Sequence, residues 1–343
     1  MRVEFLEPSQ YDLWNDFVEC SPQGDVFCYS WWLDAITRSD FRILVVKEKE
    51  KIKAGMPLAY DSQKKINLPP LTRTLGVLYC DDKYLSQQKQ SSVQRKWLSA
   101  MLENIQPDQF VQTCMHHSFT DWLPFRWSGF GQTTRYTYLL SFSGKTIGDL
   151  WNDLDNLRKR TIKRAEQNSI NIGISEDFNL VYKFASLSYK RQGLDFRIPY
   201  ADLKNLDDAI AKRGNRVIFI AQDDHKIHAV LYAAFNNRSA YYLLSGSDPD
   251  LRNLGGHTLV MWEAIKFFHD KVEYFNFGGS DIESIESHIK GYGGTLTPYF
   301  HIFNEDNLQA QQKFMFHVRK LGYHLKSLFV IGLNKVTRIH AGN

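Results

Sequence analysis

Two glycine pairs, Gly255–Gly256 and Gly278–Gly279, each stand just before a segment that predicts a helix. The amide groups of a glycine turn at a helix start can bind an anion such as a phosphate, a pyrophosphate or an oxyanion. After the second pair, Ser280 and Glu283 have the spacing of a capping box, which predicts that a helix begins there. Both pairs are therefore candidates for an anion site, although a structural turn explains each of them equally well.

Lys290 lies at the end of the helix that follows the second glycine pair. Isoleucines at helical spacing precede it and glycines follow it: Ile282, Ile285, Ile289, Gly291, Gly293 and Gly294. The negative end of a helix favours a cation, so the local pattern alone predicts a solvent-exposed helix-end lysine.

Further groups that could carry chemistry are scattered along the chain. The candidate bases are His116, His117, His257, His288 and Asp281, but their spacing assembles no nucleophile, base and orienting group, and each is explained by a structural role. The four cysteines form no CxxC pair and no metal-ligand spacing. We therefore expect no metal site, and reduced thiols in a cytoplasmic protein.

Size and composition suit a globular α/β protein of two domains. The chain has 343 residues, 14% aromatic residues and a formal net charge of +4. This mild positive charge permits an anionic partner but is too diffuse for a dedicated DNA-binding protein. The N-terminal residues predict no signal peptide, and the apolar run 328–333 is far shorter than a membrane span requires.

The predicted elements include an internal repeat. Residues 41–60 and 215–235 each contain two apolar runs joined by a charged turn, which predicts a β-hairpin. The two hairpins align with each other, which indicates two copies of one module, although hairpins share alternation in any case. A helix over about 146–167 opens the second half, and we place the domain boundary at Ser143–Gly144.

The second repeat continues in an order that resembles the acyl-CoA cradle of the GNAT acyltransferases: hairpin, further strand, glycine-bearing helix start, another strand. Arg252, Gly255 and Gly256 match much of the Arg/Gln-x-x-Gly-x-Gly/Ala signature of that family, and the resemblance implies that they bind the donor. His257 stands where that signature has Gly or Ala.

The segment FNFGGSDIESIESHIKGYGGTLTPYF is similar to the end of the second module in the Fem peptidyltransferases and their FemAB-like relatives. FVECSPQGDVFCYSWWLDAI and LDNLRKRTIKRAEQNSINI resemble the same group, so the similarity spans nearly the whole chain. It implies two tandem GNAT-like modules, residues 1–143 and 144–343, each a mixed, mostly antiparallel sheet flanked by helices. The second module would hold the donor site and the catalytic motif.

This resemblance implies an N-acyltransferase that moves an acyl group from an activated thioester or ester to an amine. The co-substrate would be acyl-CoA, an acyl carrier protein or aminoacyl-tRNA, with no tightly bound cofactor. Lys290 matches a lysine implicated in catalysis, and Arg197, Tyr242 and Tyr292 match substrate-binding positions. An ammonium group aimed at the developing oxyanion would lower the barrier to acyl transfer.

The acceptor and two alternatives stay open. We expect an amino sugar or another cell-envelope precursor, carried on a nucleotide or a lipid, but residues 31–36 lack the lysine of relatives that act on the peptidoglycan nucleotide precursor. One alternative is a Fem-type peptidyltransferase that uses aminoacyl-tRNA, and the other is a non-catalytic binding protein with the same fold. The basic run Arg158, Lys159, Arg160, Lys163 and Arg164 fits either a phosphorylated or tRNA donor or a solvated helix face.

The last predicted helix, from about Glu305, carries Arg319, Lys320 and Lys326 beside leucines. This pattern fits either packing on the second module or a peripheral contact with the inner face of a membrane.

Overall fold

The structure is a computed structural model that describes residues 1–81, 86–193, 195–279 and 283–309. The capping position Ser280 and the basic residues Arg319, Lys320 and Lys326 lie outside these ranges. Within them, no helix has the length and the apolar character that crossing a membrane requires.

The chain contains the same antiparallel four-stranded arrangement twice, which the alternating apolar runs of both hairpins had predicted. In the first half it follows the order β1-β2-β3-β4 and in the second half the order β7-β8-β9-β10. The strands are β1 (Arg2–Phe5), β2 (Phe41–Glu48), β3 (Lys51–Ala59), β4 (Leu78–Tyr79), β7 (Asn171–Ser175), β8 (Arg216–Gln222), β9 (Ile227–Phe235) and β10 (Ser239–Ser247). The central hairpins, β2–β3 and β8–β9, each contain a register shift near the turn. The predicted repeat of the hairpin is therefore confirmed.

Each four-stranded unit is followed by a long helix and a fifth strand. In the first half these are α3 (Gln87–Leu102) and β5 (Gln112–Cys114), and in the second half α9 (Gly256–Phe268) and β11 (Tyr274–Asn276). Only the second half keeps the fifth strand beside the fourth, because β11 pairs in parallel with β10. This order confirms the mixed α/β fold with two modules.

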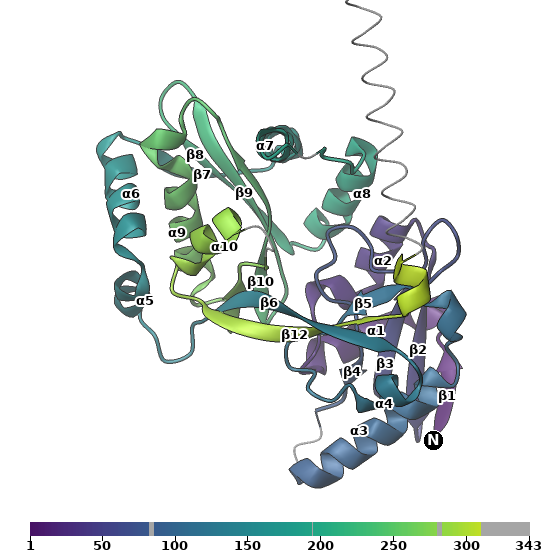
Figure 1. The fold of residues 1–343 in the computed structure, drawn as a ribbon. Coiled ribbons are helices and arrows are strands. Elements are labelled where there is room, and N and C mark those ends of the chain that lie inside the picture. Colours follow the sequence, from purple (N-terminus) through teal and green to yellow (C-terminus); the bar gives the residue numbers. More distant parts are fainter. Residues whose placement is uncertain (82–85, 194, 280–282, 310–343) are drawn as a thin grey trace, which may run out of the picture.

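The fifth strands of both halves belong to one eight-stranded sheet, in the order β5-β12-β6-β11-β10-β9-β8-β7. Here β6 (Gly131–Ser141) pairs with both β11 and β12 (Thr295–Phe303), and β12 also pairs with β5. The boundary expected at Ser143–Gly144 lies just after β6, before α5 (Ile147–Asp153), and the sheet extends across it. Figure 1 shows β6 and β12 as the long ribbon that joins the two halves.

Three apolar cores hold these layers together. The largest joins the halves: α1 (Tyr11–Cys20) and α2 (Ser30–Thr37) pack with α7 (Phe178–Arg191), α8 (Tyr200–Ala211) and one face of β10. A second core lies under α6 (Asn156–Gln167) and α9, on the opposite face of the second sheet (Figure 1). The third packs α3 and α4 (Leu123–Trp127) against the first sheet. Burial of this much aromatic surface accounts for the aromatic content of the sequence.

The helix predicted over 146–167 is wrong in one respect, because the structure has two helices there, α5 and α6. The chain is extended at Leu154, which ends α5. Asp155 then caps α6, its carboxylate accepting a hydrogen bond from the amide of Arg158 at 2.6 Å. An N-cap aspartate starts a new helix. The apolar spacing continues across this break in the helix, which is why the sequence predicted one helix.

Candidate functional site

The parallel strands β10 and β11 separate after a short pairing, which leaves one edge of β10 open. Their register covers only Ser239–Tyr241 on β10, although β10 continues to Ser247. Gly278 adopts φ +72° after β11, and a Cβ on Gly279 would lie 1.8 Å from the carbonyl oxygen of Tyr136 on β6. The second glycine pair therefore turns the chain away from β10 and against β6. It also leaves the backbone groups of β10 beyond Tyr241 without a neighbour on that side among the paired strands.

The open edge of β10 is irregular and touches the first module. A register shift between Tyr242 and Leu244 marks a bulge, a feature that re-aims side chains beside binding sites. Arg73, from the first module, donates a hydrogen bond of 3.5 Å to the carbonyl oxygen of Leu243. An extended ligand with amide groups could pair with this edge as an added strand.

Three side chains at this end of β10 form a hydrogen-bond chain. The Nε2 atom of His257, in the first turn of α9, lies 3.0 Å from Oγ of Ser245 and 3.5 Å from Oη of Tyr242. The hydroxyl groups of Tyr242 and Ser245 also bond to each other. A hydroxyl can both donate and accept, so a proton can pass along this chain to or from the imidazole.

A second histidine packs on the first. The ring of His288, on α10 (Glu283–Lys290), lies 5.2 Å from the His257 ring, and its Nε2 is 3.4 Å from Oη of Tyr292. Arg158 fixes the end of α10, because its guanidinium donates to the backbone carbonyls of Ser287 at 3.3 Å and His288 at 2.9 Å. Arg158 is 7% exposed, which corrects its assignment to a solvated basic face.

The surroundings of the two histidines are positively charged. Burial, followed by the charges of Arg191, Arg252 and Arg158, lowers the pKa of His257 to about 4. Burial, His257 and the same three arginines hold the pKa of His288 well below its usual range. Among the described residues, no carboxylate forms an ion pair with these arginines. The arrangement therefore suits an anion, which would pair with arginines that no described carboxylate pairs with.

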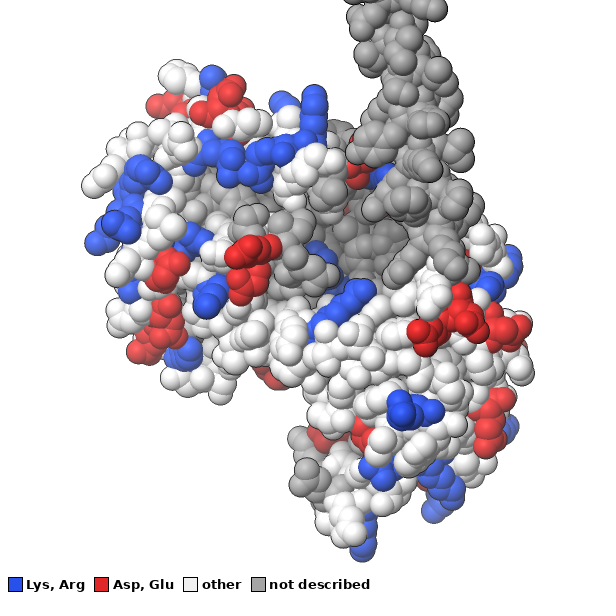
Figure 2. All heavy atoms as spheres, viewed as in Figure 1, with Lys and Arg blue, Asp and Glu red and all other residues white. Residues whose placement is uncertain are grey.

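Lysine and arginine side chains also gather on the outer surface near this site. Figure 2 shows them in a band across the second module, between the positions that α6 and α7 occupy in Figure 1. On α6, the exposed side chains of Arg160, Lys163 and Arg164 face solvent. This band extends the positive charge of the site over the adjoining surface.

The predicted glycines at the start of α9 have packing reasons of their own. Gly255 adopts φ +90°, and a Cβ there would lie 2.6 Å from the carbonyl oxygen of Thr161 on α6. A Cβ on Gly256 would lie 2.8 Å from Cβ of His228 on β9. Both glycines let the start of α9 lie against α6 and β9. Their contact with a donor stays a prediction.

The predicted arginines occupy different places. Arg252 lies exposed in the turn before α9 and is one of the charges that lower the pKa of His257. Arg197 is exposed between α7 and α8, 3.8 Å from the carboxylate of Asp195. The structure thus joins Arg252 to the histidine cluster, whereas no described contact joins Arg197 to it.

Lys290 and Tyr292 lie on either side of the turn that ends α10. Lys290 is exposed at the last helical position, and no described contact joins it to His257 or His288. Tyr292 is 1% exposed, and its ring stacks on Phe277 at 5.6 Å. The catalytic role of Lys290 and the substrate contact of Tyr292 stay predictions.

A polar network crosses between the modules below the open edge. The carboxylate of Asp25 accepts hydrogen bonds from the hydroxyl groups of Thr74, at 2.8 Å, and Tyr241. Burial raises the pKa of Asp25 to about 6. A small cavity lies beside this network, at the end of β11, and its wall includes Arg73, Thr74, His117, Tyr241, Asn276 and Gly278.

Sequence reasoning missed Ser245, Arg158 and Arg191 as members of the cluster. It named His257 and His288 among the candidate bases, and it noted His257 as a departure from a glycine-rich signature. That departure was the available signal, since a histidine where a small residue is expected adds a titratable group at the helix start. Arg191 gave no signal, because tertiary packing alone brings the end of α7 to this site.

Comparisons with known proteins agree with this architecture. Residues 155–285 match the family model of the acetyltransferase (GNAT) domain. The structure of FemX has 14% sequence identity and a TM-score of 0.67, covering 90% of this chain and 99% of that one. The C-terminal domain of a putative lysylphosphatidylglycerol synthetase from Agrobacterium fabrum has 11% identity and a TM-score of 0.53, covering 89% of this chain and 95% of that one.

A conserved protein of unknown function from Bacteroides thetaiotaomicron is also similar, with 13% identity, a TM-score of 0.52 and coverage of 88% of this chain and 100% of that one. No curated protein matches the chain. At these identities the structural likeness shows a shared fold. The family model adds a sequence likeness to the GNAT domain over residues 155–285.

Proposed function

Because residues 155–285 match the GNAT acetyltransferase family model in a chain with the fold of FemX, we propose that this protein is an N-acyltransferase. It moves an acyl group from an activated thioester or ester to an amine, and the acceptor is an amino sugar or another cell-envelope precursor. The donor is a substrate, either acyl-CoA, an acyl carrier protein or aminoacyl-tRNA.

The observation that carries the proposal is the open edge of β10 beside a cluster of arginines that form no ion pair with any described carboxylate. The edge offers backbone groups that can pair with the amides of an extended donor. Arg191 and Arg252 supply charge for its phosphates, next to the N-terminus of α9. One end of this site therefore suits the phosphates of a donor, and the other end suits an extended part of the donor that contains amide groups.

The acceptor amine would approach from the cavity between the modules, since that cavity opens at the end of β11, where the two strands separate. Arg73 spans this place, because it belongs to the first module and bonds to Leu243 on β10. An acceptor that carries a phosphate would meet the Arg73 side chain there. Residues of both modules would then be needed for the complete site.

The reaction is a direct transfer. The amine nitrogen attacks the carbonyl carbon, a C–N bond forms, and the C–S or C–O bond to the donor breaks, with the proton of the amine passing to the leaving group through a base. We assign the base to His257, which is neutral and bonded to Ser245 and Tyr242. An anionic donor beside the arginines would raise the pKa of His257 and make it a better base. Lys290 is the proposed cation for the oxyanion.

The test is transfer itself, with binding measured separately. Purified protein is incubated with glucosamine or a nucleotide-linked amino sugar and with acetyl-CoA, acyl carrier protein or charged tRNA, and the acylated amine is detected by mass. Donor binding is followed by the rise in melting temperature. Arg191→Ala combined with Arg252→Ala should abolish that rise, whereas Arg126→Ala, at an exposed position on α4 of the first module, should not.

A donor that neither stabilises the protein nor supports acylation of any amine argues against this function. If donors bind but no amine is acylated, the protein is the non-catalytic binding protein with the same fold.

The exposed basic face of α6 favours aminoacyl-tRNA as a second candidate donor. Arg160, Lys163 and Arg164 point to solvent there, and binding through such side chains to phosphates weakens steeply with salt. If charged tRNA is the donor, replacing these three residues by alanine should weaken its binding. The slope of log affinity against log salt concentration should fall by about one unit for each side chain that no longer binds a phosphate. Acyl-CoA binding should be unchanged by the same substitutions.

A further inference from the structure

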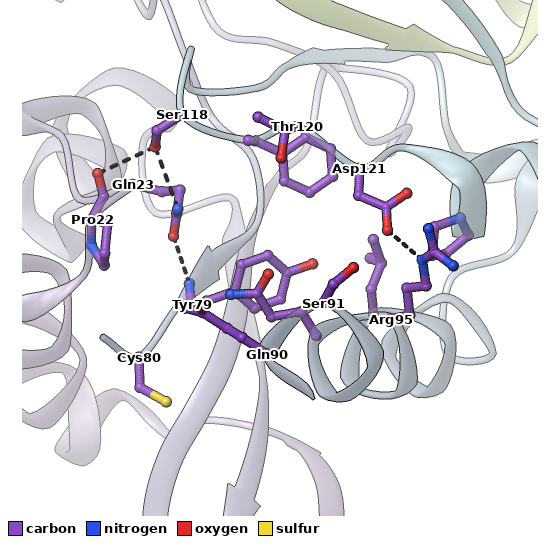
Figure 3. Close-up of a pocket in the computed structure, with 14 residues that line it drawn as sticks. Pro22, Gln23, Tyr79, Cys80, Gln90, Ser91, Arg95, Ser118, Thr120 and Asp121 are labelled. Atoms are coloured by element: carbon purple, nitrogen blue, oxygen red, sulfur yellow. Dashed lines mark hydrogen bonds and ion pairs between the residues drawn. The ribbon is translucent and has the colours of Figure 1, made fainter. Parts of the chain in front are cut away.

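The first module contains a cavity of about 340 Å³ that the acyl-transfer site does not use. Its walls are β4, the first half of α3 and the loop over 118–124 (Figure 3). The space exists because β4 pairs with β3 while β5 pairs with β12, so these two strands diverge instead of lying side by side. Its volume falls at the lower end of the range of small-molecule sites.

Buried hydrogen bonds hold one wall of this cavity in place. Gln23 is 7% exposed, and its side chain accepts from the amide of Tyr79 at 3.1 Å and donates to Oγ of Ser118 at 3.3 Å. Ser118 in turn donates to the carbonyl oxygen of Pro22 at 3.4 Å. Figure 3 shows these bonds as one chain along the cavity. The wall is therefore preformed.

The hydroxyl of Tyr79 lines the cavity. Tyr79 is 5% exposed, and its ring stacks on Phe119 at 6.3 Å with an interplanar angle of 11°. Figure 3 shows its hydroxyl in the space beside Ser91. Within the described ranges, nothing bonds to this hydroxyl. Burial and the charge of Asp121 raise the pKa of Tyr79, so the hydroxyl keeps its proton and can donate it. A ligand in the cavity could accept this proton.

The two charged side chains in the described wall of the cavity have opposite signs and form an ion pair. Among the described residues that form this wall, Arg95 and Asp121 are the charged ones, and they pair with each other through Nε and Oδ2 at 2.5 Å. Among the described residues of the wall, a phosphate would therefore find no unpaired cation, in contrast to the arginine cluster of the second module. The other described polar groups of the wall include the amides and hydroxyls of Gln23, Gln90, Ser91, Gln94, Ser118 and Thr120.

We propose that this cavity binds an uncharged, hydroxyl-rich ligand, namely a sugar ring. A sugar hydroxyl donates and accepts at once, which matches the amides and hydroxyls of the described wall residues, whose two charged members pair with each other. Leu98, Phe119 and Pro124 supply an apolar surface for the C–H face of the ring. The site is separate from the acyl-transfer site and does not depend on the proposed function.

The test is a titration of the full chain with glucose, galactose and N-acetylglucosamine at millimolar concentrations. Trp97 lies 6.5 Å from Tyr79, so its fluorescence reports binding. Tyr79→Phe removes only the hydroxyl and should weaken binding about tenfold or more. Ser91→Phe fills the cavity and should abolish binding. Tyr136→Phe, at a position 51% exposed on β6, serves as the matched control and should leave binding unchanged.

Three results would overturn the proposal. The first is that none of the sugars binds, which would leave a cavity that holds water only. The second is that a sugar binds the Tyr79→Phe and Ser91→Phe variants as tightly as it binds the wild type. The third is that free pantetheine, an uncharged amide chain, displaces the sugar and binds more tightly. Melting temperatures of both variants close to that of the wild type show that loss of binding is not loss of fold. Donor binding to the second module should be unchanged in both.

Discussion

Tyr241 on β10 donates its hydroxyl proton to the carboxylate of Asp25, which belongs to the first module. Asp25 is fully buried and also accepts from Thr74. Tyr241 is the last residue of β10 that pairs with β11, so this bond joins the modules where the two strands separate. The stability of the interface and the geometry of the candidate site are therefore linked through one buried carboxyl group.

We expect Asp25→Asn to remove a pH dependence of folding. Burial raises the pKa of Asp25 to about 6, above its ordinary value of 3.8, so the folded state binds more protons between these values. Stability from this group is present below about pH 4 and is lost as pH rises through 6, by up to about 3 kcal/mol. The difference in unfolding free energy between wild type and Asp25→Asn, measured in urea, should change by that amount from pH 4 to 7.

Asp16→Asn is the matched control for this experiment, because Asp16 is an exposed aspartate on α1. Its difference from wild type should stay nearly constant over the same range. A difference between wild type and Asp25→Asn that does not vary with pH would contradict the raised pKa.

Gly255→Ala should destabilise the protein more than an ordinary glycine replacement at positive φ. The new Cβ would meet the carbonyl oxygen of Thr161 at 2.6 Å, in addition to the strain of φ +90°. Gly214→Ala is the control, since Gly214 has φ +69° and open space around it. We expect a loss of about 1 kcal/mol for Gly214→Ala and about 3 kcal/mol or more for Gly255→Ala, measured by chemical unfolding. If both variants lose the same unfolding free energy, α9 can move away from α6 to accommodate the new Cβ with little loss of stability.

Lys290→Met should lower turnover by about 10²-fold or more and leave the fold intact. The lysine is exposed at the end of α10, so its loss removes only a weak interaction with the helix dipole. Lys212→Met replaces another exposed lysine at a helix end, that of α8, and should change neither turnover nor melting temperature. Turnover that stays at the wild-type level in Lys290→Met would remove this lysine from the mechanism.

His257→Gln should lower turnover by about 10²–10⁴-fold, because glutamine can bond to Ser245 but cannot take up a proton. In an NMR titration of the free protein, His257 should stay neutral down to about pH 5, consistent with its pKa of about 4. An anionic donor that contacts Arg191 and Arg252 should raise this pKa. If the donor binds and the pKa does not move, the arginines hold something other than the donor.

The sequence predicted the parts of the fold that depend on local pattern. The hairpins over 41–60 and 215–235 were read correctly because alternation of apolar residues reports directly on strands. The break between α5 and α6 was missed although Asp155 is a good N-cap, because the apolar spacing runs through it. The path of β6 between β11 and β12 could not be read, since pairing between distant strands leaves no local mark.

The candidate site was predictable to a similar degree. Arg252 was identified as a donor-side residue and lies beside the histidine cluster. Arg158 was assigned to a solvated face, because an arginine on an amphipathic helix is usually exposed, yet it is buried and bonded to the end of α10. Ser245 and Arg191 join the cluster through tertiary packing, which a single sequence does not encode in any short pattern.

The position of β12 also bears on how the chain folds during synthesis. Both β5 and β6 pair with β12, so two strands from the first half of the chain lack this neighbour until residues 295–303 have been made. Contacts of such sequence separation form slowly, and exposed strand edges attract other chains in the meantime. A nascent chain that stalls before β12 would therefore present an unpaired edge to the crowded interior of the cell, and chaperone binding should be strongest at that length.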